Sequence, residues 1–310
     1  MTIADPDVSV ESVVAKETAS GSAKKALSSP WASLAAVVIA VLWTIPTAGL
    51  LISSFRPEDD VKTSGWWTGL TGPFTTENYR AVMTGSDTDL ATYFVNTIVI
   101  TIPAVIIPVC LAVIAAYAFS WMKFPGRDFL FVCVFALQIV PIQVTMIPLL
   151  RLYVQPPFNL QPLAGGDAPG GGFYTIWLSH SIFALPLAIY LLHNFMSQIP
   201  GELIESARVD GAGLVQTYAR IILPISISGF VVTLIWQFTS VWNDFLFALF
   251  LTQQNNGPVT LGLAALAGGQ KVDYAASMAG ALITSLPTLL VYILLGRWFI
   301  GGLMAGALKG

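Results

Sequence analysis

The chain has 310 residues, of which 55% are hydrophobic and 10% are charged, and its mean hydropathy is +0.74. A soluble domain carries about 25% charged residues because its surface faces water, so this composition excludes an ordinary soluble protein and favours one embedded in membrane lipid. The net charge of −3 leaves no basic surface for a nucleic-acid partner.

The first 30 residues are polar and of mixed charge, and they lack the short apolar core and cleavage box of a signal peptide. We therefore expect residues 1–30 to form a disordered cytoplasmic tail. The first apolar segment is then an uncleaved anchor, and residues 31–310 form the predicted membrane domain.

Six apolar segments follow along the chain. Each is long enough for a helix of about 20 residues, which crosses about 30 Å of hydrocarbon. The polar run 253–258 interrupts a seventh uncharged stretch and predicts a loop. We predict an all-α, polytopic protein with spans near 34–55, 95–119, 129–150, 174–196, 226–250 and 276–300.

Prolines lie inside several of these spans. Each removes a backbone N–H donor and kinks its helix, and membrane helices tolerate this where neighbours satisfy the freed groups. Kinked helices also suit a bundle that rearranges, so the prolines fit a transporter and a static bundle alike. They are Pro46, Pro103, Pro108, Pro141, Pro148, Pro186 and Pro287.

The bias of Lys and Arg among the loops sets the expected orientation. With the N-terminus in the cytoplasm, more basic residues lie inside than outside, and the sixth span returns the C-terminus to the cytoplasm. We therefore predict a multi-pass protein of the cell membrane with both termini cytoplasmic. The inner set is Lys16, Lys24, Lys25, Lys123, Arg127, Arg208, Arg220, Arg297 and Lys309, and the outer set is Arg56, Lys62, Arg80, Arg151 and Lys271.

Residue types that carry chemistry are scarce. Cys110 and Cys133 lie in long apolar runs, which predicts small buried side chains with no disulfide and no metal site. His180 and His193 have no Cys, Glu or Asp at ligand spacing, and we interpret both as structural. No Walker-type phosphate loop occurs, and Asp244 is the only carboxylate near the interior of a span. The sequence predicts no catalytic, cofactor or metal site, so the energy for any transport comes from another chain.

Residues 197–222, between the fourth and fifth spans, predict a short helix outside the membrane. Ser197 is a suitable cap, and Pro200 suits an early helical position. Gly211 supplies the stop, since glycine accepts the left-handed conformation common just past a helix end. Ala207 and Gly211 are four residues apart, which leaves one face nearly bare and open to another protein.

This loop resembles the EAA loop of the permeases of binding-protein-dependent ABC importers. The similar runs are Glu205-Ser206-Ala207, Asp210-Gly211-Ala212 and Ile221-x-Leu223-Pro224. The loop departs from the family at Ser206, where the family has alanine, and at Ser228, where a proline is often found. The resemblance implies a type I ABC importer permease fold in which the helix couples transport to a separate ATPase. The coupling residues that it implies are Glu202, Glu205, Ser206, Ala207, Asp210, Gly211, Ala212 and Pro224.

Two further motifs resemble the carbohydrate-uptake, maltose-permease-like branch of that family, and the likeness as a whole covers about residues 30–310. Trp242-Asn243-Asp244-Phe245 is similar to its Trp-Asn-Glu-Phe signature, and residues 302–310 are similar to its C-terminal ending. The resemblance implies an ATP-driven sugar importer. Its implied partners are a second homologous permease, two ATPase subunits and an extracytoplasmic sugar-binding protein or lipoprotein. It also implies that Gly306, Lys309 and Gly310 contact the ATPase.

A polar and aromatic face on the fifth span is a candidate solute path. Gln237, Ser240 and Asp244 recur at i, i+3 and i+7, and Trp236 and Asn243 extend an adjoining stripe through Ser240. Amide and carboxylate groups suit sugar hydroxyls, and an indole ring suits the apolar side of a sugar. The alternative is that Asn243 and Asp244 tie the span to neighbouring helices, as polar residues within membranes often do.

Three other functions fit less well. An ABC permease for a non-sugar solute, such as an amino acid or phosphate, would share the loop but not the carbohydrate motifs. A membrane-embedded enzyme would need acid, histidine or metal clusters inside the membrane, and a channel would not need the 205–224 loop.

Overall fold

The computed structural model describes residues 30–85, 89–165, 168–253, 256–268 and 272–307. The chain divides into two compact units, Met1–Thr75 and Thr76–Gly310. The described residues form helices and turns and no strand, as the apolar sequence predicts. The tail predicted to be disordered lies outside the described residues except for its last residue, Pro30.

In the first unit, one buried arginine organises the segment after the first apolar helix. The guanidinium of Arg56 donates to the carbonyls of Asp60 and Gly65 at 3.0 and 3.1 Å, and to the Thr68 hydroxyl at 3.2 Å. These bonds fold the segment into a compact turn. The helices of this unit are α2 (Pro30–Ser54), α3 (Glu58–Thr63) and the 3-10 turn η1 (Trp66–Leu70).

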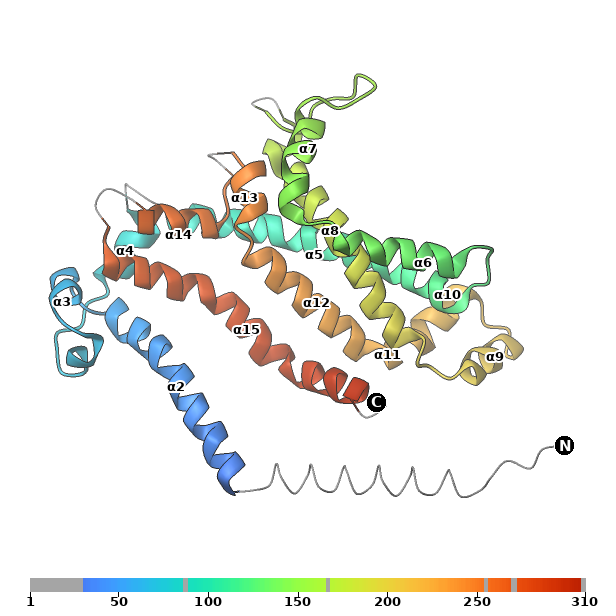
Figure 1. Cartoon of the computed structure of the whole chain (residues 1–310), viewed down its shortest axis with the longest axis horizontal. Helices are drawn as coiled ribbons and strands as arrows, with labels where there is room; N and C mark the ends of the chain where they lie inside the picture. Colours follow the sequence, from blue (N-terminus) through green and yellow to red (C-terminus); the bar gives the residue numbers. More distant parts are fainter. Residues whose placement is uncertain (1–29, 86–88, 166–167, 254–255, 269–271, 308–310) are drawn as a thin grey trace. The chain divides into compact units, whose positions relative to one another are not determined.

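The second unit is a helical bundle in which α5 and α8 pack side by side, and α12 packs against both (Figure 1). The helix α15 lies along α12, while α9 and α14 lie at opposite ends of the unit. We call these ends the α9 end and the α14 end. The elements are α4 (Glu77–Thr84), α5 (Leu90–Trp121), α6 (Arg127–Ala136), η2 (Leu137–Ile139), α7 (Ile142–Val154), η3 (Pro169–Gly172), α8 (Phe173–Met196), α9 (Gly201–Val209), α10 (Leu214–Thr217), η4 (Tyr218–Ile222), α11 (Leu223–Ile225), α12 (Ile227–Trp242), α13 (Leu246–Leu251), α14 (Val259–Gly268) and α15 (Tyr274–Ala307).

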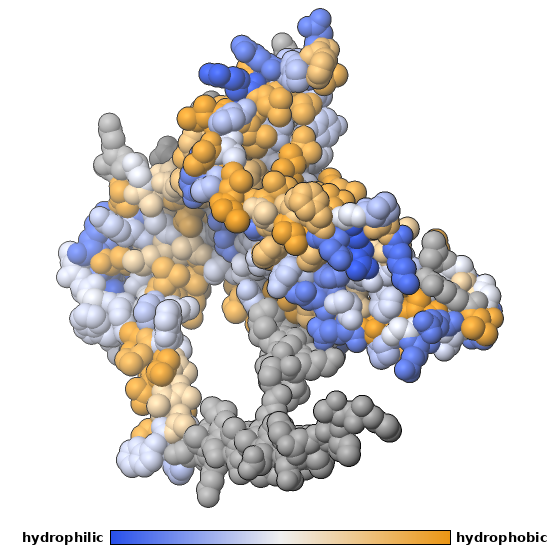
Figure 2. Space-filling model, turned by 45° about the vertical axis from the view of Figure 1, so that its right-hand side comes forward, coloured by the Kyte–Doolittle hydropathy of each residue, from blue (hydrophilic) through white to orange (hydrophobic). Residues whose placement is uncertain are grey.

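Within the described ranges, four helices are long and apolar enough to cross a membrane, and two bent helix pairs raise the number to six. The four correspond to the predicted first, second, fourth and sixth spans. Hydrophobic residues cover much of the surface of the bundle (Figure 2), as expected for helices that face lipid. The four are Pro30–Ser54, Leu90–Trp121, Pro169–Met196 and Tyr274–Trp298.

The predicted third span, 129–150, is bent by 97° and is not one continuous helix. The η2 turn ends at Ile139, and α7 begins at Ile142. Pro141 has no N–H to donate, and its ring disfavours helical backbone at the preceding residue. Val140 is accordingly extended, with ψ 117°.

The predicted fifth span, 226–250, is also interrupted. The helix α12 ends at Trp242. At the next residue, Asn243, the backbone is no longer helical, and the side-chain Nδ2 donates to the Thr239 carbonyl at 3.0 Å. A second helix, α13, begins after Asp244. The described residues of the polar run 253–258 form a loop, as predicted. The loop leads into α14, a helix that the sequence analysis did not predict.

Both cysteines are free and exposed, whereas the sequence analysis expected them to be buried. Cys110 lies on α5 and Cys133 on α6. In a membrane, lipid tails are as apolar as a protein interior, so an apolar run does not show which of its side chains face inward.

Candidate functional site

A short helix with a glycine stop lies at the α9 end of the bundle. Gly211 adopts φ +79°, and the Ala212 N–H donates to the Ala207 carbonyl at 2.9 Å. This six-to-one bond past a left-handed residue is the Schellman ending. The predicted helix and its stop are therefore confirmed. Ser197 is not the cap of α9, because it ends α8, where its N–H donates to the His193 carbonyl.

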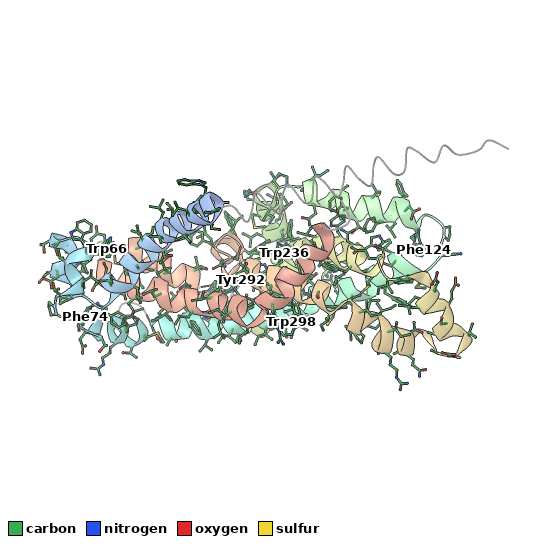
Figure 3. The ribbon with its side chains drawn as sticks, turned by 90° about the horizontal axis from the view of Figure 1, so that it is seen from below. Trp66, Phe74, Phe124, Trp236, Tyr292 and Trp298 are labelled. Carbon is green, nitrogen blue, oxygen red and sulfur yellow. The ribbon has the colours of Figure 1, made fainter. Side chains whose placement is uncertain are left out.

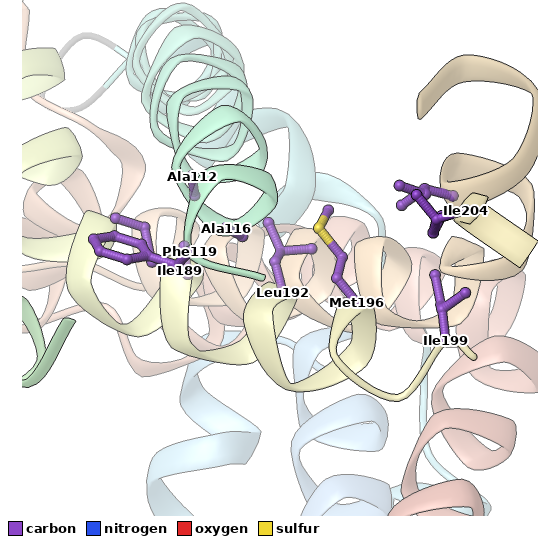
Figure 4. Close-up of a cluster of buried hydrophobic side chains, with 10 residues drawn as sticks. Ala112, Ala116, Phe119, Ile189, Leu192, Met196, Ile199 and Ile204 are labelled. Carbon is purple, nitrogen blue, oxygen red and sulfur yellow. The ribbon is translucent and has the colours of Figure 1, made fainter. Parts of the chain in front are cut away.

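One face of α9 packs against the bundle. Ile204 and the nearby Ile199 are buried in a cluster that includes Leu192 and Met196 of α8 (Figure 4). Ala207 lies three residues after Ile204, on the same face, and is only 6% exposed. The small-residue face that was predicted to admit another protein is thus covered, at Ala207, by the chain itself.

The opposite face of the loop is exposed and combines acidic and apolar side chains. Glu202 and Glu205 are exposed, and so is Ser206, whose hydroxyl donates to the Glu202 carbonyl at 2.7 Å. Val209 is 87% exposed although it lies outside the candidate spans, and Val215, at the start of the second bent pair, is 81% exposed. Of the other candidate coupling residues, Asp210, Gly211 and Pro224 are exposed, and Ala212 is half-buried.

Irregular helical backbone connects this loop to α12. The short α10 leads into η4, a π-helical turn, and then into α11. Buried Thr217 and Ile222 hold this stretch in place. The chain then bends by 76° at Ser226, where α12 begins. A non-helical turn at residues 210–213 follows α9, and a series of helical turns then leads from α10 to the middle of the bundle.

The candidate solute-path residues on α12 divide into two groups. Trp236 is half-buried midway along the bundle (Figure 3), and Ser240 and Asn243 are exposed on the same stripe. Gln237 is 2% exposed, and its Nε2 donates to the Ala104 carbonyl of α5 at 2.9 Å. Its amide thus contacts a neighbouring helix, which is the alternative that the sequence analysis left open.

Asp244 lies at the break between α12 and α13. Its Oδ1 accepts the Phe247 N–H at 3.3 Å, and its Oδ2 accepts the Ala248 N–H at 3.0 Å. Its own carbonyl accepts the Thr260 hydroxyl of α14 at 2.6 Å. A carboxylate suits this place because the first N–H groups of a helix have no partners within the helix.

The structure brings His180 close to Asp244, a pairing that the sequence analysis missed. The His180 Nε2 atom lies 3.8 Å from Asp244 Oδ2, and this buried nitrogen has no hydrogen-bond partner among the described residues. Its ring packs edge-on against Phe247 at 4.7 Å between centroids. The two residues are far apart in the chain, so motif spacing held no signal for the pair.

The C-terminal candidates fall at the limit of the described chain. Gly306 lies in the last turn of α15, and Lys309 and Gly310 lie outside the described residues. Among the residues that the structure does describe, no three of the His, Cys, Asp and Glu side chains gather as a metal site would require.

Up to six apolar spans among the described residues, together with a loop helix that is exposed on one face, define a polytopic membrane protein. Residues 108–299, more than half of the chain, match the family described as "Binding-protein-dependent transport system inner membrane component". The chain belongs to this family. The matched range contains the whole loop, α12 and the Asp244 break.

Curated relatives and solved structures agree with this assignment. The chain is 40% identical to the osmoprotective compounds uptake permease protein GgtD of Synechocystis, over 89% of this chain and 91% of that protein. It is 31% identical to the alpha-glucoside transport system permease protein AglG of Rhizobium meliloti, over 90% and 97%. A bacterial ABC transporter involved in the import of alginate shares its fold, with a TM-score of 0.68 and 17% identity over 96% of this chain and all of that one.

Proposed function

We propose that this chain is the transmembrane permease subunit of an ATP-driven ABC importer that moves a sugar into the cytoplasm. The observation that carries the proposal is the α9 loop, which is fixed to the bundle on one face and exposed on the other, within the range that matches the family. A rigid exposed helix joined to the spans suits transmission of force from another subunit.

We assign the exposed face of α9 as the surface that docks on a cytoplasmic ATPase. On this face Val209 supplies apolar contact area, and Glu202 and Glu205 supply charge beside it. We place Gly306, Lys309 and Gly310 at the same ATPase subunits. The family's binding-protein dependence and the alginate importer, whose structure holds a periplasmic protein bound to an alginate pentasaccharide, support an extracytoplasmic binding protein as partner. A second homologous permease completes the proposed complex.

The names of the relatives favour a sugar over the alternative solutes. They include permeases for alpha-glucosides, diacetylchitobiose and glucose. An amino acid or phosphate, the alternative from the sequence, has no such support here.

Uptake by a strain that lacks this chain tests the proposal. Radiolabelled maltose, glucose, diacetylchitobiose, alanine and phosphate are supplied singly, with and without the restored chain. We expect ATP-dependent uptake of at least one sugar to return with the chain, and uptake of alanine and phosphate to be unchanged. Restoration of alanine or phosphate uptake alone would refute the assignment of a sugar as the solute, but it would not refute the assignment of the chain as a permease.

The solute path is a separate part of the proposal, and it rests on Trp236, Ser240 and Asn243. Each is replaced singly by alanine, and uptake is measured beside ATPase activity in the assembled complex. A lining role requires a changed sugar preference or a changed concentration for half-maximal uptake. If every variant either transports normally or fails to assemble, α12 holds the bundle together and the sugar passes elsewhere.

A further inference from the structure

Prolines inside spanning helices leave backbone carbonyls without donors. In an α-helix each N–H bonds to the carbonyl four residues earlier, and proline has no N–H. Its ring also clashes with the carbonyl four residues earlier, which therefore has no donor within its own helix. In hydrocarbon no water replaces the missing donor, so another part of the protein must supply it.

Two such carbonyls on α5 accept hydrogen bonds from other helices. The Trp177 Nε1 of α8 donates at 3.0 Å to the Val99 carbonyl, four residues before Pro103. The Gln237 Nε2 of α12 donates at 2.9 Å to the Ala104 carbonyl, four residues before Pro108.

Two further side-chain N–H groups donate to carbonyls near the prolines of α8 and α15, but these carbonyls lie three residues before the proline, where the helical donor is the N–H of the residue after it. The Gln138 Nε2 of η2 donates at 3.2 Å to the Phe183 carbonyl, three residues before Pro186. The Trp242 Nε1 of α12 donates at 2.9 Å to the Thr284 carbonyl, three residues before Pro287. Each donor is an uncharged side-chain N–H on a different element from its proline.

We propose that Trp177 and Gln237 are positioning residues that fix the backbone of α5 at Pro103 and Pro108, by donating to the two carbonyls that those prolines leave without a donor. Each bond ties one helix to another at a bend, so it determines both the angle of the bend and the register of the pair. Without the donor, the kink has no fixed partner and the helix samples other bends.

Two of the four donors, Gln237 and Trp242, lie on α12. Both side chains are buried, at 2% and 3% exposure, and they fasten α12 to α5 near Pro108 and to α15 near Pro287. Because α12 continues through the bend at Ser226 into the α9 loop, a displacement of that loop reaches both kinked helices through these two bonds. This inference stands whether or not the transported solute is a sugar.

The pairing of Gln237 with Pro108 gives a sharp test, because Pro108→Ala restores the missing N–H. The Ala104 carbonyl then has a donor within α5, and the Gln237 amide is no longer required. We expect Gln237→Leu to lower the unfolding temperature of the full-length chain, extracted from membranes in detergent, by about 2–4 °C. This is the shift that roughly 1 kcal/mol causes in a protein of 150–250 residues. In the Pro108→Ala background the same substitution should have little effect.

A second pair supplies the matched control. Trp177→Phe keeps the aromatic packing and removes the N–H, and Pro103→Ala should rescue it. Pro103→Ala should not rescue Gln237→Leu, and Pro108→Ala should not rescue Trp177→Phe. Gln143→Leu, at an exposed glutamine of α7, should change nothing in any background. A general change in stability would not produce this crossed pattern.

The kink itself is measured with spin labels at positions 95 and 114, two exposed positions of α5 on either side of its prolines, after Cys110 and Cys133 are replaced by serine. We expect Gln237→Leu to broaden the distance distribution, and Pro108→Ala to give one longer distance with either residue at 237. If Gln237→Leu prevents assembly, Gln237→Met is used, and recovery of assembly on adding Pro108→Ala supports the proposal. Equal effects of Gln237→Leu in both proline backgrounds, or an unchanged distance distribution, would overturn it.

Discussion

Both carboxylate oxygens of Asp244 accept backbone N–H groups of the chain itself, at Phe247 and Ala248. From the sequence, this residue was either a solute contact or a tie within the bundle. The hydrogen bonds favour the second role, because a carboxylate that accepts two N–H groups at a helix start has less capacity left for a sugar hydroxyl. His180, beside it, supports the same conclusion by packing on Phe247.

Asp244→Ala is therefore expected to destabilise the chain, by about 0.5–2 kcal/mol, the usual loss when a helix-capping side chain is removed. Asp244→Asn keeps one acceptor oxygen and should lose less. Thermal unfolding of the chain in detergent measures both. If the alanine variant is as stable as the wild type while sugar uptake falls, Asp244 acts on the solute and the capping role is secondary.

For single residues, the sequence indicated which side chains are polar better than it indicated which groups they contact. The polar character of Gln237 was evident, but its acceptor is a backbone carbonyl on α5, and a carbonyl carries no sequence signal. Pro108 was the one indirect sign, since a proline in a span implies that some neighbour must donate. The identity of that neighbour depends on tertiary packing.

Among the elements, α9 is the one whose C-terminal end the sequence predicts well. Local chemistry sets its stop, because glycine alone accepts φ +79° without strain, and this requirement is independent of packing. The breaks at Val140 and Asn243 were harder to predict. The apolar run around Val140 contains Pro141 and Pro148, which fit a kinked span as well as a 97° bend, and the run around Asn243 contains no proline that would indicate a break.

Gly211→Val is expected to abolish coupled uptake. A Cβ at this position would meet nothing within 4 Å, so the damage comes from backbone strain and not from a clash within the chain. For a left-handed residue this strain is about 1–2 kcal/mol, and Asn tolerates it best among side-chain residues. We expect uptake to fall in the order Gly, Asn, Ala, Val at position 211, with the protein still assembled.

Gly201→Ala is the matched control, since Gly201 also has open space around its Cβ position but has no positive φ. It should transport normally. Uptake and ATPase activity of the assembled complex are measured together for all variants. Normal uptake by Gly211→Val would remove α9 from the coupling surface.

For the whole molecule, the direction of the bundle across the membrane remains a prediction from the Lys and Arg bias. Single cysteines at positions 60 and 165 should react with a membrane-impermeant maleimide from outside intact cells. Cysteines at 126 and 205 should react only after permeabilisation. The background must lack Cys110 and Cys133, because both are exposed. Labelling of position 205 from outside would reverse the orientation and exclude a cytoplasmic ATPase at α9.

The C-terminal segment gives a second prediction at this scale. Deletion of residues 306–310 should impair coupled uptake and leave membrane insertion intact, because the apolar span within α15, Tyr274–Trp298, ends before this segment begins. Insertion is checked by the amount of full-length protein in membranes, and coupling by uptake per complex. Unchanged uptake would mean that the end of the chain makes no required contact.

The π-helical turn η4, between the α9 loop and α12, accommodates one more residue than an α-helical turn of the same rise. Each residue of an α-helix advances its direction by about 100°. Deleting one residue within Tyr218–Ile222 would therefore convert the turn to ordinary α-helix while the spans keep their faces, whereas a deletion inside α12 would rotate every side chain beyond it. The chain between the loop helix and α12 thus carries a local surplus of one residue.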